Sequence, residues 1–292
     1  METFILQLIN GIRTGSIYAL IALGYTMVYG IAKMINFAHG DIIMVGAYAL
    51  YMLWAVVKLP LPLAMLLTVV ICSVLGVTIE RVAYKPLRNA PSLAVLITAI
   101  GMSFLLQAVS LLLFGATPIK SENIVQLKGF HIGSIMIPGL PMLTLAVTIV
   151  CMIVLTLFIN KTKAGRAMRA VSEDKQAAAL MGINVNRTIS LTFAIGSALA
   201  AIAGILYLSQ YKSLTPTMGA LPGIKAFVAA VFGGIGSIPG AMLGGILLGI
   251  IEVMAKAYIN SALADAIVFG VLVIVLLVKP SGLLGKNRIE KV

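Results

Sequence analysis

The charged residues of this chain divide it into apolar stretches of about 20 residues each. An α-helix of about 20 mostly apolar residues is long enough to cross the hydrocarbon core of a bilayer. Hydrophobic residues make up 61% of the 292 residues and charged residues 10%, whereas soluble domains carry about 45–50% and about 25%. The sequence therefore predicts an all-α membrane protein with many crossings, and it excludes a soluble enzyme.

Nine crossings are predicted, and two of them are irregular. Asp41 lies near the start of the second crossing, and Lys225 lies inside the seventh, which is also short. A re-entrant or broken helix at either place would leave eight or seven full crossings. The predicted ranges are 4–30, 37–57, 61–80, 92–114, 141–160, 188–210, 220–235, 237–257 and 262–279.

Lysine and arginine gather in three hydrophilic segments, at 81–88, at 161–187 and after residue 279. Loops rich in Lys and Arg stay in the cytoplasm, so we expect these segments inside and the segment 115–140 outside. Counting crossings then puts the N-terminus outside and the C-terminus in the cytoplasm. The net charge of +12 is interpreted as this orientation signal and not as a nucleic-acid surface.

Two polar interruptions resemble each other at an offset of 179 residues, from residue 36 to residue 215. Each follows a long apolar stretch and leads through a glycine into another apolar helix. The match predicts repeat halves at 4–114 and 188–279, which would be inverted because five crossings separate their starts. Inverted repeats with broken helices are a common plan of transporters, and chance similarity between two apolar stretches is the alternative.

The candidate translocation path is formed by the polar residues of these interruptions. Asn36 and Asp41 are interpreted either as an N-cap and a first-turn acid, or as part of a broken helix that lines a path. His39 is either a hydrogen-bonded structural residue or a proton relay, and the proline of the second interruption breaks a helix. The candidate path residues are Asn36, Phe37, His39, Asp41, Thr215, Pro216 and Thr217.

Gly236, Gly240 and Gly244 recur every four residues, a spacing that lets helices approach closely in lipid. We expect these glycines to serve helix packing, and we expect an ion pair between Glu252 and Lys256. Two histidines and two cysteines form no metal-ligand pattern. The sequence thus predicts no metal site, no bound cofactor and no enzymatic activity on this chain.

The segment 161–187 predicts a short amphipathic helix at the membrane surface. Ser172 is a plausible N-cap, with Glu173 and Asp174 in the first turn, and Gly182 or Asn184 would end the helix. Such a helix either lies on anionic lipid or docks a cytoplasmic partner.

Three motifs resemble known permeases. Gln176-Ala177-Ala178-x-x-x-Gly182 resembles the Glu-Ala-Ala-x-x-x-Gly coupling motif of ABC importer permeases, with Gln in place of Glu and without the distal Ile-x-Leu-Pro. The segments 15–30 and 34–41 resemble the N-terminal signature of LivH-type branched-chain amino-acid permeases, and 226–240 resembles their C-terminal signature. The resemblance covers essentially the whole chain.

The resemblance implies a multi-pass permease subunit in the bacterial cytoplasmic membrane, within an ATP-driven importer of leucine, isoleucine or valine. It implies a second, LivM-like permease, two cytoplasmic ATPases that hold ATP and Mg²⁺, and an extracytoplasmic substrate-binding protein that contacts 115–140. The implied ATPase coupling residues are Arg169, Glu173, Asp174, Gln176, Ala177, Ala178 and Gly182.

Three alternatives remain open at this point. Similar permeases carry urea or short amides. A secondary transporter would use an ion gradient, with His39, Asp41 or Glu252 carrying a proton, and it would need no docking helix. A membrane scaffold would transport nothing with any partner.

Overall fold

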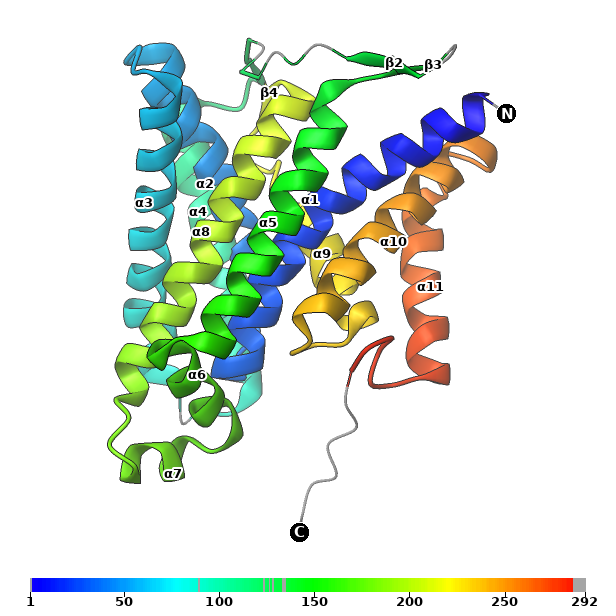
Figure 1. The fold of residues 1–292 in the computed structure, drawn as a ribbon. Coiled ribbons are helices and arrows are strands. Elements are labelled where there is room, and N and C mark those ends of the chain that lie inside the picture. The colour runs from blue at the N-terminus through cyan, green and yellow to red at the C-terminus, as the bar shows by residue number, and fades with distance from the viewer. Residues whose placement is uncertain are drawn as a thin grey trace.

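The computed structural model describes residues 2–88, 90–122, 124–125, 127, 129–132 and 135–285, and they form a bundle of long helices (Figure 1). Two short antiparallel pairs of strands, β1 with β4 and β2 with β3, lie at one end. The helices are α1 (Glu2–Ala32), α2 (His39–Tyr51), η1 (Met52–Val56), α3 (Leu61–Ile79), η2 (Glu80–Tyr84), η3 (Lys85–Leu87), α4 (Ser92–Phe114), α5 (Gly139–Lys161), α6 (Lys163–Glu173), α7 (Lys175–Leu180), α8 (Val185–Tyr211), α9 (Ala220–Gly233), α10 (Ile238–Tyr258) and α11 (Ala264–Val278). The strands are β1 (Ile119–Lys120), β2 (Phe130–Ile132), β3 (Ile135–Ile137) and β4 (Ser213–Leu214).

The all-α polytopic fold is confirmed, with an apolar helix at each of the nine predicted positions. Seven of these are long and apolar enough to cross a membrane, counting the turns η1, η2 and η3 that extend α2 and α3. The other two, α9 with 14 residues and α11 with 15, span about 21–23 Å at 1.5 Å per residue. The sequence indicated that the seventh crossing is short, but it did not indicate this for the last one.

Three helical segments end close to a lysine in the left-handed backbone conformation, and one of these lysines is Lys58, with φ 63° after η1. Lys33 follows α1 with φ 59°, and Lys212 follows α8 with φ 52°. A non-glycine residue with positive φ is uncommon and cannot continue a right-handed helix. The chain therefore leaves both helices at these points, and it resumes as α2 after 33–38 and as α9 after 212–219.

The interior of the molecule is built around α1 and α8. α1 packs along α10 and α9, while α8 packs along α3 and α2. In the most apolar stretch of each helix, 89% of the α1 residues and 67% of the α8 residues are buried. The corresponding share is 17% in α4 and in α5. The apolar surfaces of α4 and α5 are thus left for lipid or for other subunits.

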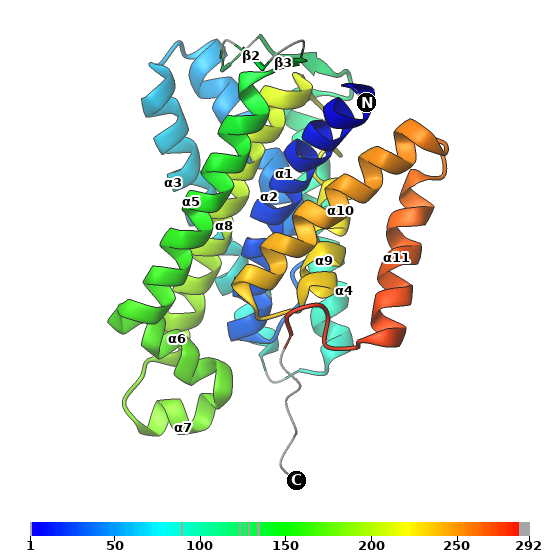
Figure 2. The same ribbon diagram turned by 45° about the vertical axis from the view of Figure 1, so that its right-hand side comes forward.

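The hydrophilic segments separate to the two ends of the bundle (Figures 1 and 2). α6 and α7 lie at one end, and the strands and the start of α1 lie at the other. The basic segment around Arg81 lies beside the start of α8, so it shares the end of α6 and α7. Lys128 and residues 286–292, which complete the predicted charge pattern, lie outside the described residues.

The three glycines that were expected to serve helix packing differ in their surroundings. A Cβ at Gly240 would meet the carbonyl oxygen of Gly233, and one at Gly244 would meet that of Ala229, so α10 and α9 pack in close contact there. The expectation for Gly236 is wrong, since this residue precedes α10 with φ 91° and has no atom within 4 Å of a Cβ position. Gly236 serves a tight turn, because its backbone conformation favours glycine.

Candidate functional site

The first helix break is the segment 33–38 between α1 and α2. Its Asn36 side chain contacts η2 and does not cap α2. Asn36 is buried, and its Oδ1 accepts a hydrogen bond of 2.9 Å from the Tyr84 hydroxyl of η2. α2 is preceded by Ala38 and has no side-chain cap. The interpretation of Asn36 as an N-cap is therefore wrong. Asp41 does lie in the first turn of α2, where a carboxylate complements the helix dipole.

Two buried polar side chains of α2 retain unused hydrogen-bonding atoms. Gln107 of α4 donates to Asp41 Oδ1 at 2.9 Å, and the His39 ring lies edge-on to Tyr25, with ring centroids 4.7 Å apart. His39 Nε2 and Asp41 Oδ2 are buried and have no hydrogen-bond partner among the described residues. Buried polar atoms are nearly always paired in native proteins, so each of these two atoms is suited to bind water or a polar group of a ligand.

The second helix break is the segment 212–219 between α8 and α9, and its three candidate path residues differ in exposure. Pro216 is buried, Thr215 is half-buried, and Thr217 is exposed. The Met218 amide donates to the Thr215 carbonyl at 3.1 Å, which closes a turn before α9. An interruption of the helix at Pro216 is what its fixed φ and missing N–H predict.

The two breaks meet through glycine backbones. A Cβ at Gly40 would lie 2.6 Å from the carbonyl oxygen of Gly219 and 3.0 Å from Gly223 Cα. The first residues of α2 and α9 are thus in backbone contact, which larger residues would prevent. Phe37, at the first break, is half-buried and packs on Phe227 of α9, with ring centroids 5.5 Å apart.

The cytoplasmic loop of the sequence analysis folds as two helices, α6 and α7. Asp174 caps α7, since its Oδ1 accepts from the amides of Gln176 at 2.7 Å and Ala177 at 3.0 Å. The expectation that Ser172 is the N-cap is wrong, because the buried Val171 keeps α6 helical to Glu173 and the Ser172 hydroxyl donates to the Arg169 carbonyl at 2.7 Å.

The end of α7 is fixed by Gly182. Its φ is 81°, and its amide donates to the Ala179 carbonyl at 3.0 Å. The Ile183 amide donates to the Ala178 carbonyl at 3.0 Å. These two bonds form a Schellman motif. Asn184 begins the next helix instead, since its Oδ1 accepts from the Arg187 amide at 3.0 Å.

α7 leaves most of its surface open. Gln176, Ala177, Arg169, Glu173 and Asp174 are exposed, and Ala178 is buried against the bundle. Leu180 and Met181 are 89% and 83% exposed. These two adjacent apolar side chains are therefore exposed at a hydrophilic end of the bundle.

Lys175 ties α7 to the first helix break. Its Nζ donates to the carbonyl of Ala32, the last residue of α1, at 3.1 Å. Burial and the nearby Arg88 lower the pKa of Lys175 from its ordinary value, because the ammonium is partly desolvated and faces another cation. The first helix break, which contains Asn36, follows Ala32 directly. The hydrogen bond of Lys175 therefore connects α7 to the residue that precedes the candidate path.

Sequence reasoning missed Gln107, Lys175, Leu180 and Met181. Gln107 lies inside the predicted crossing 92–114, and intramembrane polar residues commonly face a partner or a cavity. The sequence therefore held a signal that could have identified Gln107 as a candidate site residue. Leu180 and Met181 were visible as an apolar pair in a hydrophilic segment. The contact of Lys175 with Ala32 carries no local sequence signal.

Comparisons with known proteins match nearly the whole chain. Residues 7–276 match the family model for the permease component of branched-chain amino acid transport systems. The chain is 45% identical to the high-affinity branched-chain amino acid transport permease LivH of Escherichia coli K12, over 99% of this chain and 98% of that one. It is 46% identical to BraD of Pseudomonas aeruginosa with the same coverage, and 28% identical to the autoinducer 2 import permease LsrD of Escherichia coli over 93% and 83%.

Proposed function

This chain belongs to the family of permease components of branched-chain amino acid transport systems, and we propose that it carries leucine, isoleucine or valine across the bacterial cytoplasmic membrane. It is a multi-pass membrane subunit and not the ATP-hydrolysing one. The observation that carries the proposal is the full-length identity of 45–46% with LivH and BraD. The more distant LsrD serves a different substrate, so we base the substrate class on the nearer relatives.

The translocation path is assigned to the contact between α2 and α9. Neither helix has a side-chain cap, but the amides of His39, Asp41 and Ala220 already donate to backbone carbonyls of the breaks. We assign the remaining first-turn amides, those of Gly40 and Leu221, to an anion such as a substrate carboxylate. Asp41 Oδ2 is an acceptor for an ammonium group. These groups suit the two charges of an amino-acid zwitterion, which urea and short amides lack.

The two halves of the path are assigned to an inverted repeat. Lys33 and Lys212 share the left-handed conformation at the same offset of 179 residues as the polar interruptions. In each half the first helix packs on the second and third helices of the other half. α1 runs toward the end that holds α6 and α7, and α8 runs away from it (Figure 1), as inversion requires.

The partners are assigned to opposite ends of the bundle. A cytoplasmic ATPase docks on α7, with Leu180 and Met181 in its groove and Arg169, Glu173 and Asp174 at the rim. ATP and Mg²⁺ belong to that subunit. A second permease lies beside this chain, and a substrate-binding protein docks at the end with the strands. Two observations support these assignments. Leu180 and Met181 are exposed, and basic segments gather at the end of the bundle that holds α7, as the positive-inside rule expects of a cytoplasmic end.

Reconstitution into proteoliposomes tests the function. The chain is combined with its partner permease, ATPases and binding protein, and uptake of radiolabelled leucine is followed with and without ATP. We expect uptake that requires ATP and every partner and that excess valine inhibits. Uptake without ATP that an ionophore abolishes would instead establish a gradient-driven transporter. ATP-dependent uptake of urea but not of leucine would overturn the substrate class.

A further inference from the structure

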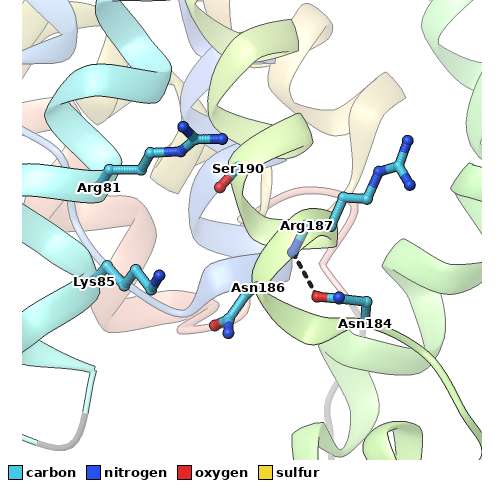
Figure 3. Close-up of a pocket in the computed structure, with 6 residues that line it drawn as sticks. All are labelled: Arg81, Lys85, Asn184, Asn186, Arg187 and Ser190. Atoms are coloured by element: carbon cyan, nitrogen blue, oxygen red, sulfur yellow. Dashed lines mark hydrogen bonds between the residues drawn. The ribbon is translucent and has the colours of Figure 1, made fainter.

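A basic cavity lies at the end of the bundle that carries α6 and α7, and its lining includes none of the residues of the two helix breaks. It has a volume of about 430 Å³. Its lining consists of Arg81, Lys85, Asn184, Asn186, Arg187 and Ser190. Figure 3 shows Arg81 and Lys85 extending toward α8, where Asn186 and Ser190 face them, while Arg187 extends from the other flank of α8.

The cavity is positively charged because its lining holds Arg81, Lys85 and Arg187, while the carboxylate of Glu80, beside Arg81 in the chain, is buried and paired. Glu80 is fully buried, and its two oxygens accept from Arg88 and from the Ser190 hydroxyl. No acidic residue is among the lining residues. Arg81 and Lys85 are four residues apart on one side, and like charges at this spacing repel. An anion between them would relieve this repulsion.

The polar side chains of the lining offer hydrogen-bond donors. Asn186 Oδ1 accepts from Arg88, and Asn184 Oδ1 accepts from the Arg187 amide. Because each amide oxygen is used, the group that each side chain can offer a ligand is its NH₂. The first turn of α8 is already capped by Asn184, so the side chains, and not the helix end, define this site.

Exposed apolar side chains lie on η2, which contributes to the cavity lining, and on α4, which packs against η2. Val82, between Arg81 and Lys85 in the chain, is 70% exposed, and Leu93 at the start of α4 is 65% exposed. Cations beside exposed apolar side chains at a bilayer edge suit a ligand with an anionic head and apolar chains. A ligand with several acceptor oxygens also matches the arginine fork and the amide donors.

We propose that this cavity binds a phosphate group, supplied either by the headgroup of an anionic phospholipid or by a free phosphate compound. Arg81 and Lys85 contact the phosphate oxygens, and the amides of Asn184 and Asn186 complete the site. The residues assigned to the translocation path are not among those that line this cavity, so its occupancy and the proposed function are tested separately.

Native mass spectrometry of the complex, purified with its partner subunits in nanodiscs that contain phosphatidylglycerol, tests the proposal. The test variant is Arg81→Gln with Lys85→Gln. The matched control is Lys161→Gln with Lys163→Gln, which removes two exposed lysines at the same end. We expect the test variant to bind phosphatidylglycerol about 30-fold more weakly, since each Lys or Arg near an anionic surface contributes about fivefold. The control should bind as the natural chain does.

Inorganic phosphate, titrated with phosphatidylcholine as the only lipid, distinguishes the two sources. A lipid headgroup is supported if the test variant loses phosphatidylglycerol binding and the natural chain binds no inorganic phosphate at millimolar concentration. Saturable phosphate binding that only the test variant loses supports a free phosphate compound. Unchanged binding of both probes in the test variant overturns the proposal, as does an equal loss in the control. Loss of ATPase co-purification alone would assign the cavity to subunit docking and would also overturn it.

Discussion

At the scale of single residues, a group of charged side chains from three helices meets around Glu252 of α10. Glu252 Oε1 accepts from Lys225 of α9 at 2.8 Å and from Lys256 at 2.5 Å, and Oε2 accepts from the Tyr18 hydroxyl at 2.8 Å. Lys225 also pairs with Asp265 at 2.7 Å. The expected pair of Glu252 with Lys256 is confirmed. Burial of ionised groups is tolerated only with such pairing.

Replacing Glu252→Gln should destabilise the chain by about 3 kcal/mol, because it leaves the buried Lys225 without one of its two counter-charges. Thermal unfolding of the purified chain in detergent measures the effect. Lys256→Gln is the matched control, since Lys256 is 46% exposed and exposed ion pairs contribute about 1 kcal/mol or less. Equal destabilisation by the two variants would contradict a role for burial.

Replacing Lys175→Met should uncouple ATP hydrolysis from transport, because it removes the contact with the Ala32 carbonyl while leaving the exposed face of α7 unchanged. The number of leucine molecules transported per ATP should fall several-fold, while ATPase co-purification persists. Lys163→Met, on the neighbouring α6, controls for the lost charge. A fall in ATPase binding with unchanged transport per ATP would instead make Lys175 a docking residue.

At the scale of elements, glycine decides how closely helices approach and where they end. Gly40 and Gly219 allow the starts of α2 and α9 to touch, and Gly182 ends α7 with a positive φ. Gly101 of α4 differs, since no atom lies within 4 Å of a Cβ there. The glycines at helix crossings and ends are therefore required, and the glycine on the open face of α4 is replaceable.

Replacing Gly40→Val should prevent α2 and α9 from packing, because the added Cβ would overlap the Gly219 carbonyl. We expect a loss of several kcal/mol and a low yield of folded protein. Gly101→Ala is the control, and it should stabilise α4 by about 0.5–1 kcal/mol, since glycine is unfavourable inside a helix. Yield and thermal unfolding measure both. A fully stable Gly40→Val variant would refute the close contact.

Replacing Gly182→Arg should abolish ATP-dependent transport, because a bulky cation with an unfavourable left-handed backbone would stand beside Leu180 and Met181. Gly182→Asn should retain most of it, since asparagine tolerates this backbone conformation. Leucine uptake and ATPase co-purification measure the two effects. Undiminished transport in Gly182→Arg that collapses with an ionophore would favour the gradient-driven alternative.

At the scale of the whole molecule, the two ends of the bundle differ in charge and in structure. The end with α6 and α7 carries the basic segments 81–88 and 161–187 and the exposed apolar pair, and the other end carries the strands. α4 and α5 expose apolar faces along the sides. This distribution separates an apolar lateral surface from two hydrophilic ends.

Cysteine labelling should place these ends on opposite sides of the membrane. In a background with Cys72→Ala and Cys151→Ala, Lys120→Cys should react with a membrane-impermeant maleimide in intact spheroplasts. Arg166→Cys should react only after permeabilisation, because segments rich in Lys and Arg are expected on the cytoplasmic side. Both positions are exposed. Labelling of Arg166→Cys in intact spheroplasts would reverse the orientation.

The sequence by itself determined the positions of the nine apolar helices and the polar breaks at residues 36 and 215. It narrowed the end of the loop helix to Gly182 or Asn184, and the structure decided for Gly182. These features are local, because apolar residues must leave water, proline cannot donate a backbone hydrogen bond, and a positive φ favours glycine. The family was also visible in short motifs along the chain.

The tertiary structure alone decided which side chains meet. Asn36 pairs with Tyr84, Lys225 lies between Glu252 and Asp265, and Lys175 reaches Ala32. These contacts join residues up to 143 positions apart, and they depend on how each helix is rotated against its neighbours. That rotation is set by packing among many apolar side chains of similar hydrophobicity, and no local pattern in this sequence encodes it.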